Sequence, residues 1–146
     1  MSLENVSSMF QIDIKTFSFN KHSINNLQES SDDLWPIVYL IEDSNKLEAY
    51  IGESTDVYRR MTNHLQNPIR KGLSKVHLIS SKSFNKSATL DIESRLIKYI
   101  AADGHFKLQN GNAGLTVHNY FQKDKYEDTF EQIWKKLENK NLVKNN

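Results

Sequence analysis

One segment, KSATLDIESRLIKYIAADG at residues 86–104, predicts a long helix that places a carboxylate among apolar side chains. Four residues at helical spacing lie in one row on its surface: Leu90, Glu93, Ile97 and Ile100. The helix has other positions for an acid, because Asp91, Arg95 and Lys98 lie off this row. Charged residues are rarely buried unless they are paired or bind a metal. We therefore expect Glu93 to have a partner elsewhere in the fold.

The composition limits the classes of protein to which the chain can belong. Its 146 residues fit one ordinary domain, and 38% hydrophobic with 25% charged residues is near the globular average. The absence of cysteine excludes disulfides and thiolate chemistry and fits a reducing compartment. No apolar run approaches the roughly 20 residues of a membrane-spanning helix, and no signal-peptide pattern opens the chain. These features predict a soluble, cytoplasmic protein with no membrane partner.

The net charge of +1 conceals a basic middle segment. Residues 56–86 contain seven lysines and arginines but a single acid, Asp56. Such a segment indicates a surface that faces a polyanion, although an ordinary solvated surface gives the same pattern.

The alternation of apolar residues predicts a small, mostly antiparallel sheet. Residues 10–19 form a strand, with a bulge or bend where the apolar phase shifts between Ile14 and Phe17. Residues 37–52 form an antiparallel hairpin, and residues 75–80 a further strand. Residues 22–33 fit a short helix or a loop, and residues 106–115 fit a turn-rich loop.

Two more helices are predicted beside the one that carries Glu93. The first begins near Ser54–Asp56 and ends near Gln66, before Pro68, with Val57, Met61 and Leu65 in its apolar row. The second covers about Asp124 to Asn139, and the residues at core spacing in it are Tyr126, Phe130, Ile133, Trp134 and Leu137. The order of elements in the middle of the chain predicts an α+β fold.

Several polar side chains are placed where they could share one site. Arg60 and His64 are four residues apart at the edge of the first helix's apolar row, and Tyr39 and Tyr50 lie on adjacent strands. Each has an ordinary structural interpretation: a surface arginine, a satisfied histidine, or core aromatics with bonded hydroxyls. Together with Glu93 they suggest phosphodiester chemistry. A carboxylate can hold a divalent ion, a guanidinium can stabilise an oxyanion, and a phenol or imidazole can position or deprotonate water.

The segment IVYLIEDSNKLEAYIGESTDVYRRMTNH resembles the signature of the GIY-YIG nucleases. The first triplet is Ile37-Val38-Tyr39 and the second is Tyr50-Ile51-Gly52, with ten residues between the two tyrosines. The positions that match the family's later residues are Arg60, His64, Glu93 and Asn110, with Asn112 as the alternative register for the asparagine. Ile37 stands where the family has its first glycine, which removes no catalytic atom.

The resemblance covers about residues 35–112 and implies a three-stranded antiparallel sheet flanked by helices. Residues 1–34 are then an N-terminal extension with one added strand, and residues 113–146 a C-terminal helical elaboration of a single compact domain. The sequence also resembles, loosely, versions of the family fused to larger ATPase or helicase-like proteins. We expect a monomer, and we find no zinc finger, helix-turn-helix or long basic arm that would give sequence specificity.

The resemblance implies a metal-dependent endonuclease that hydrolyses DNA phosphodiesters. Glu93 would bind Mg²⁺ or Mn²⁺, Tyr39 and Tyr50 would position or activate water, and Arg60 would stabilise the phosphorane. His64 would carry a proton or contact phosphate, and Asn110 would hold the site's geometry. The expected contacts to backbone phosphates are Arg59, Arg70, Lys71 and Lys75.

Two alternatives to a nuclease remain compatible with the sequence. One is a catalytically silent module that binds or targets nucleic acid. The other is a domain that docks a partner ATPase through the face of the last helix that carries Tyr126, Phe130 and Trp134.

Overall fold

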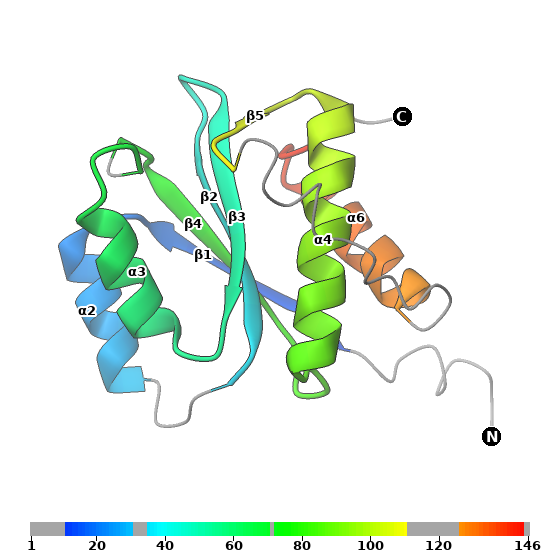
Figure 1. Ribbon diagram of the computed structural model, residues 1–146, viewed down its shortest axis with the longest axis horizontal. Helices are drawn as coiled ribbons and strands as arrows, with labels where there is room; N and C mark the ends of the chain where they lie inside the picture. Colours follow the sequence, from blue (N-terminus) through cyan, green and yellow to red (C-terminus); the bar gives the residue numbers. More distant parts are fainter. Residues whose placement is uncertain (1–10, 31–34, 71, 111–125, 145–146) are drawn as a thin grey trace.

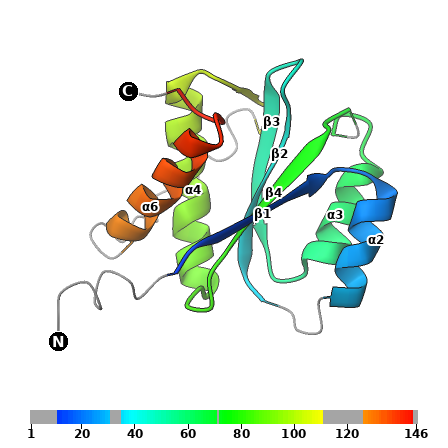
Figure 2. The same ribbon diagram turned by 180° about the vertical axis from the view of Figure 1, so that it is seen from behind.

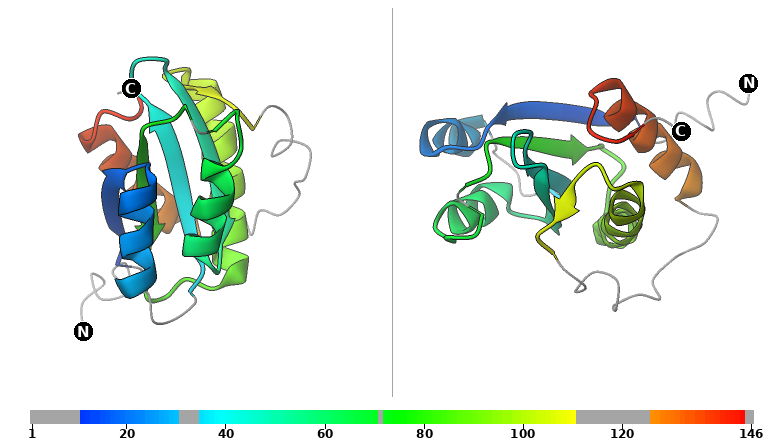
Figure 3. Two further views of the ribbon diagram at one scale, coloured as in Figure 1. Left: turned by 90° about the vertical axis from the view of Figure 1, so that its left-hand side faces the viewer. Right: turned by 90° about the horizontal axis from the view of Figure 1, so that it is seen from above.

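The structure is a computed structural model that describes residues 11–30, 35–70, 72–110 and 126–144, without the side chains of residues 28–30. A five-stranded sheet lies between two layers of helices (Figure 1 and Figure 3). The strands are β1 (Asp13–Ser18), β2 (Ile37–Asp43), β3 (Glu48–Ser54), β4 (Lys75–Ser80) and β5 (Lys107–Leu108). The described helices are α2 (Lys21–Ser30), α3 (Val57–Leu65), α4 (Lys86–Asp103) and α6 (Glu127–Asn139).

The strand order is β1-β4-β2-β3-β5, and every pairing is antiparallel except that of β3 with β5. The predicted three-stranded antiparallel sheet is therefore present as β4-β2-β3, and the α+β class is confirmed. The N-terminal strand β1, whose pairing the sequence left open, adds to the edge at β4. All seven residues of β2 are buried, which follows from its central position under helices on both faces.

Each face of the sheet has its own apolar cluster. On one face α2 and α3 pack over residues that include Tyr39, Ile41 and Val76. On the other face α4 and α6 pack over residues that include Leu40, Ile51 and Ile79. Figure 2 shows β1 crossing from one helical layer toward the other along the outer side of β4. Because neighbouring residues of a strand point to opposite faces, each strand contributes to both clusters.

The predicted bulge in the first strand is wrong. β1 pairs with β4 in one continuous register, from Asp13 opposite Ser80 to Ser18 opposite Lys75. Ile14 packs against the cluster under α4 and α6, whereas Phe17 packs against the cluster under α2 and α3. The apolar phase shifts because the strand changes the face that it buries, and the backbone keeps its regular pairing.

Helix α4 is covered on more sides than the sequence pattern predicted. It begins after Asn85, whose side chain accepts a hydrogen bond from Ala88 N, and ends at Gly104, which is in the left-handed region with φ 80°. Asp91 and Arg95 are buried and form an ion pair of 2.5 Å, so the expectation of polar surface positions there is wrong. α6 packs against this helix, which places Tyr99 and Phe130 ring centroids 4.9 Å apart.

A buried histidine and glutamate join β4 to β2. His77 Nε2 lies 2.8 Å from Glu42 Oε2, and both side chains are almost fully buried. Thr16 Oγ1 lies 2.8 Å from His77 Nδ1, and Ser44 Oγ donates to Glu42 Oε1 at 3.1 Å. The polar atoms of this pair are therefore well satisfied, as buried polar groups usually are.

The structure also decides the segments whose fold the sequence left open, and it shows how the last helix is buried. Residues 21–30 form a helix, which Asn20 Oδ1 caps by accepting from Ser23 N, and the expected loop at 106–115 contains the short strand β5. In α6 the side chains of Phe130 and Ile133 are buried, and so is Tyr126 just before it, which removes most of the proposed docking face. The residues just before Tyr126 lie outside the described part of the chain. No described helix combines the length and the apolarity needed to cross a membrane.

Candidate active site

The sequence-predicted residues gather where β3 runs between α3 and α4. β5 pairs with β3 at Glu48 and Ala49, and the side chain of Asn110 continues this pairing as far as Ile51. Beyond Ile51, no strand of the described chain pairs with this side of β3. Figure 3 shows α3 and α4 on either side of this edge. Side chains from both helical layers can therefore meet there.

Gly52 provides the space that the phenol of Tyr39 occupies. The two residues are directly opposite each other in the antiparallel pair of β2 and β3. A Cβ atom on Gly52 would lie 2.3 Å from Tyr39 Oη and 2.5 Å from Cζ, far inside van der Waals contact. The phenol ring thus lies across the backbone of the second triplet, and only glycine permits this position.

Tyr39, His64 and Arg60 form a chain of hydrogen bonds. Tyr39 Oη lies 2.7 Å from His64 Nε2, and Arg60 Nε donates to the same phenol oxygen at 3.4 Å. A phenol has one proton to donate and Arg60 is only a donor, so Tyr39 donates to His64 Nε2 when that nitrogen is unprotonated. The geometry therefore favours a neutral His64 that carries its proton on Nδ1.

The electrostatics agree with this assignment. Burial, together with the charges of Arg70 and Arg60, lowers the pKa of His64 to about 4. Burial raises the pKa of Tyr39 well above that of an ordinary phenol, although the hydrogen bond from Arg60 opposes this. At neutral pH the imidazole is therefore an uncharged acceptor and the phenol an uncharged donor.

The helix α3 holds Arg60 and His64 in place. Asp56 caps it by accepting a hydrogen bond from Arg59 N at 3.2 Å, and the helix ends at Gln66 as predicted. Arg60 and His64 are one turn apart on the same face, and Met61 between them is fully buried against the sheet. This anchoring directs both polar side chains to Tyr39.

Tyr50 lies beside this group, and a second arginine stacks on its ring. Its ring centroid is 6.4 Å from that of Tyr39 and 4.9 Å from that of His64. Arg70, from the loop between α3 and β4, places its guanidinium carbon 3.8 Å above the centroid of Tyr50. The basic segment thus contributes a charge directly to the site.

Glu93 approaches from the opposite helical layer. It is half-buried on α4, and burial together with the nearby carboxylate of Glu53 raises its pKa to about 7, although Lys86 and Arg60 oppose this. Among the residues that the structure describes, none forms a hydrogen bond or ion pair with its carboxylate. The charge of Glu93 also contributes to the raised pKa of Tyr39, after burial and the effect of Tyr50. Glu93 is therefore electrostatically coupled to the other half of the site.

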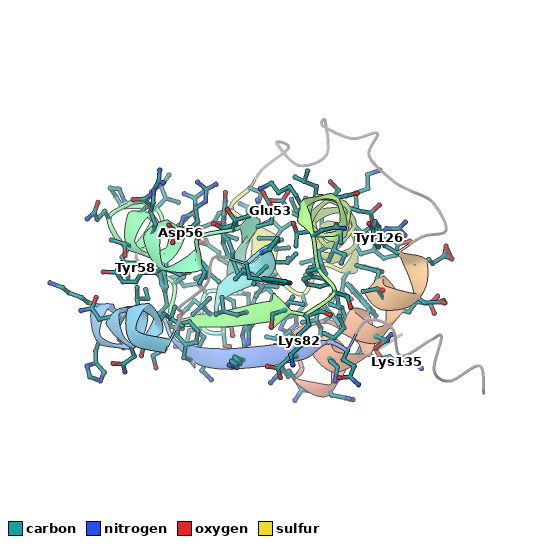
Figure 4. All side chains as sticks on the ribbon, turned by 90° about the horizontal axis from the view of Figure 1, so that it is seen from below. Glu53, Asp56, Tyr58, Lys82, Tyr126 and Lys135 are labelled. Carbon is teal, nitrogen blue, oxygen red and sulfur yellow. The ribbon has the colours of Figure 1, made fainter. Side chains whose placement is uncertain are left out.

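Glu53, the residue after Gly52, points to α4. Lys86 Nζ donates to both of its carboxylate oxygens at 2.8 Å, and Thr89 Oγ1 donates to one of them at 3.2 Å. Figure 4 shows Glu53 next to α4, whereas Asp56 and Tyr58 lie on the α3 side. The alternation of β3 explains this, because Tyr50 and Gly52 face α3 and Glu53 faces the other way.

The donor set around Glu93 fits a hard divalent ion that keeps much of its water. No group of three or more histidine, aspartate or glutamate side chains encloses an ion in the described part of the chain. Mg²⁺ commonly binds through one or two carboxylates, waters and substrate phosphates, which Glu93 and the neighbouring Glu53 can accommodate. The raised pKa of Glu93 indicates a negative charge that its surroundings compensate poorly.

The side chain of Asn110 is bonded to the backbone of the second triplet. Its Oδ1 accepts from Ile51 N at 3.0 Å, and its Nδ2 donates to Ile51 O at 2.8 Å. These two bonds fix the backbone between Tyr50 and Gly52. The alternative, Asn112, lies outside the described residues.

The other predicted DNA contacts are dispersed. Arg59 is exposed on α3, one residue before Arg60. Lys75 is exposed at the start of β4, opposite Ser18 and Glu42, on the face that α4 and α6 cover. Lys71 lies outside the described residues.

Sequence reasoning did not find Glu53 or Lys86 as members of the site, although the alternation of β3 signalled the orientation of Glu53.

The comparison with protein families agrees with this geometry. The family model of the GIY-YIG catalytic domain matches residues 36–98. Residues 36–98 form a GIY-YIG catalytic domain. The resemblance seen in the sequence is thereby confirmed, and the GIY-YIG family is a family of nucleases. No match was found among curated proteins or among solved structures.

The matched span of the GIY-YIG domain contains five of the six residues that the sequence assigned to catalysis, and Asn110 lies beyond it. It also contains Glu53, Arg70 and Lys86. The sheet pairing reaches further than the match, because β1 lies before it and β5 after it.

Proposed function

We propose that this chain is a metal-dependent endonuclease that hydrolyses DNA phosphodiester bonds. One observation carries the proposal: the bonded chain of Arg60, Tyr39 and His64 lies on one side of β3, and the poorly compensated carboxylate of Glu93 lies on the other. A phosphodiester placed at the free edge of β3 would meet both.

Glu93 would hold Mg²⁺ or Mn²⁺, directly or through water. When bound, such an ion neutralises charge on the phosphate and stabilises the leaving oxygen. Arg60 is permanently charged and offers its remaining N–H groups to a phosphate oxygen while Nε stays on the phenol.

Tyr39 and His64 would act together on the attacking water. Tyr39 takes a proton from the water as it gives its own to His64 Nε2, along the existing 2.7 Å hydrogen bond. The raised pKa of Tyr39 means that the phenol does not ionise alone, so the imidazole is needed as acceptor. Tyr50 would orient the water or the phosphate beside them, and Asn110 would keep the second triplet in position.

The positive charge near the site favours a polyanion as substrate. Arg59, Arg70 and Lys71 lie on or just after α3, and we assign Arg59 and Lys71 to phosphates that flank the bond to be cut. Lys75 is on the face away from Tyr39, and the proposal gives it no contact with the reacting phosphate.

A cleavage assay of wild type and Glu93→Gln tests the proposal. Supercoiled plasmid, branched duplex and single-stranded oligonucleotides are incubated with Mg²⁺, Mn²⁺ or chelator. We expect metal-dependent cutting by the wild type and a loss of at least about 10³-fold in the variant. Glu131→Gln, which removes an exposed glutamate on α6, is the matched control and should cut normally.

Two results would contradict the assignment. Full cutting by Glu93→Gln at the same metal concentration would remove Glu93 as the metal ligand. Binding of DNA by the wild type without cutting in either ion would favour the silent binding module.

A further inference from the structure

Arg70 lies closer to the candidate active site than a contact to a distant backbone phosphate would require. Its guanidinium carbon lies 3.8 Å above the centroid of Tyr50, and Tyr50 in turn lies 4.9 Å from the ring of His64. Arg60 reaches the same group from α3. The two guanidinium groups thus converge on one cluster of phenol and imidazole rings, from different segments of the chain.

The loop that carries Arg70 is held on both sides of it. Asn67 Oδ1 accepts from Ile69 N at 2.9 Å, and Arg70 O accepts from Leu73 N at 2.9 Å. Gln109 Nε2 donates to Ile69 O at 3.2 Å. Gln109 is next to Asn110, whose amide fixes β3 at Ile51, so one short segment after β5 positions both members of the Arg70–Tyr50 stack. An arginine held in this way loses little freedom when it binds an anion.

One donor of this guanidinium is buried and unused. Among the described residues, no hydrogen-bond acceptor is in reach of Arg70 Nε. Leaving a buried charged donor without an acceptor costs free energy, and a phosphate oxygen would remove this cost.

We propose that Arg70 is a second catalytic arginine, which contacts the scissile phosphate opposite Arg60. This rests on the proposed nuclease function and deepens it, because it separates Arg70 from the residues that bind flanking phosphates. The stack on Tyr50 keeps the guanidinium in position, and its free N–H groups face the anion. Burial, together with the charges of Arg70 and Arg60, lowers the pKa of His64. Binding of the phosphate offsets the two charges, so the imidazole becomes a better acceptor when substrate is present.

The matched pair Arg70→Lys and Arg59→Lys tests this assignment. Both keep the charge and lose the planar fork, but only Arg70 is stacked in the site. Single-turnover rates are measured at saturating DNA, and affinity is measured separately by fluorescence anisotropy in chelator. We expect Arg70→Lys to lower the rate about 10²–10³-fold while the Kd for DNA rises less than about fivefold, as for loss of one oxyanion donor. Arg59→Lys, at a residue assigned to flanking phosphates, should raise the Kd and should lower the rate at saturating DNA much less than Arg70→Lys does.

A second readout does not depend on cleavage. The Nε–H resonance of Arg70 is followed by NMR in wild-type protein as thymidine 3′,5′-bisphosphate is added without metal. We expect a saturable shift of this resonance, and a smaller shift for Arg59. Thermal unfolding of each variant confirms that it is folded.

The outcomes separate the two proposals. A wild type that cuts DNA, with Arg70→Lys within threefold of its rate, would overturn the role of Arg70 and leave the nuclease intact. Equal losses of rate and affinity in both variants would likewise reduce Arg70 to a general contact. If the wild type does not cut, the nuclease proposal fails, and the bisphosphate titration decides alone: a shift of the Arg70 resonance supports a phosphate site, and no shift overturns it.

Discussion

Two regions of the molecule use the same pair of residue types in opposite ways. In the first, Glu42 and His77 bind each other across β2 and β4, and Thr16 and Ser44 bond to their remaining atoms. In the second, Glu93 and His64 lie on opposite sides of β3. His64 bonds to a phenol, and the carboxylate of Glu93 has no hydrogen-bond partner within the described chain.

The difference teaches how to separate structural from functional polar residues. Glu42 and His77 are nearly as buried as any apolar residue of the core, yet each compensates the other. Glu93 is less buried, and its raised pKa indicates that the described residues compensate its charge poorly. Burial alone ranks Glu42 and His77 as the more unusual pair, whereas the accounting of hydrogen bonds points to Glu93 and His64. The following predictions test this comparison.

The largest difference between the two regions is expected in the rate of DNA cleavage. His64→Gln removes the proton acceptor of Tyr39 and should slow cutting by about 10²–10⁴-fold, the range for loss of a general base. His77→Gln should leave the rate per folded molecule within about threefold, because that ring bonds Glu42 and Thr16 and no residue of the candidate site. Rates are corrected for the folded fraction by circular dichroism. A larger loss in His77→Gln than in His64→Gln would reverse the comparison.

A methyl group at Gly52 should break the reactive region without touching a polar atom. Gly52→Ala places a carbon against the phenol of Tyr39, and the ring must move off the backbone. We expect cutting to fall about 100-fold, by analogy with other misplaced catalytic groups, and the free energy of unfolding to fall by about 1–3 kcal/mol from overpacking. Gly72→Ala is the control, because its Cβ would meet only the flexible end of Lys46. Equal effects of the two substitutions would show that the fit of Tyr39 on Gly52 is unimportant.

The two glutamates should affect stability with opposite signs. The pKa of Glu93 is about 7 in the folded protein against an ordinary 4.5, so the folded state holds the proton to higher pH than the unfolded chain does. This stabilises the fold below about pH 4.5, and the benefit is lost as the pH rises to about 7. The free energy of unfolding of Glu93→Gln should therefore exceed that of wild type by about 1–3 kcal/mol at pH 8 and by almost nothing at pH 4.

Glu42→Gln should instead lose about 1–3 kcal/mol at pH 8, because a buried hydrogen-bonded partner of His77 is removed. Urea unfolding in metal-free buffer at pH 4 and pH 8 gives the free energy of unfolding of wild type and of both variants. If both variants were less stable than wild type at pH 8, or both were more stable, the distinction between a compensated and an uncompensated carboxylate would be contradicted.

The smallest effect is expected at Asn110. Its two bonds to Ile51 are to the backbone, and Asn110→Ala should cost about 1 kcal/mol of stability and roughly tenfold in cutting, through looser placement of Tyr50 and Gly52. Asn110→Asp, which keeps the acceptor but not the donor, should lie between wild type and alanine. Crystal structures or amide shifts of Ile51 would show whether β3 has moved.

The parts of the fold and site that follow from local patterns could be predicted from the sequence. The alternation of the hairpin, the helix spacing of Arg60 and His64, and the cap at Asp56 each involve neighbouring residues, and the structure has all of them. The parts that failed depend on distant contacts. The pattern of α4 assumed one buried face, but α6 packs against the same helix, and Asp91 and Arg95 are buried as a pair. β5 has two residues, too few for any periodicity.

The same limit applies inside the site. The sequence placed Arg70 among general phosphate contacts, because a stack on Tyr50 joins residues twenty positions apart through a loop with no periodic pattern. Glu53 and Lys86 meet across two elements in the same manner. Charge composition indicated residues 56–86, and the fold shows that Arg70 of this segment joins Arg60 beside Tyr50.

The contact of Tyr39 with Gly52 also constrains how this chain can evolve. The phenol fills the volume that a side chain at position 52 would take, so position 52 must stay glycine while Tyr39 is retained. A lineage that replaces Tyr39 by a small residue opens this volume, and larger residues at position 52 then become tolerable. Under the proposed nuclease function, descendants that have lost cleavage should therefore show paired replacements at positions 39 and 52, which can be detected in sequences alone.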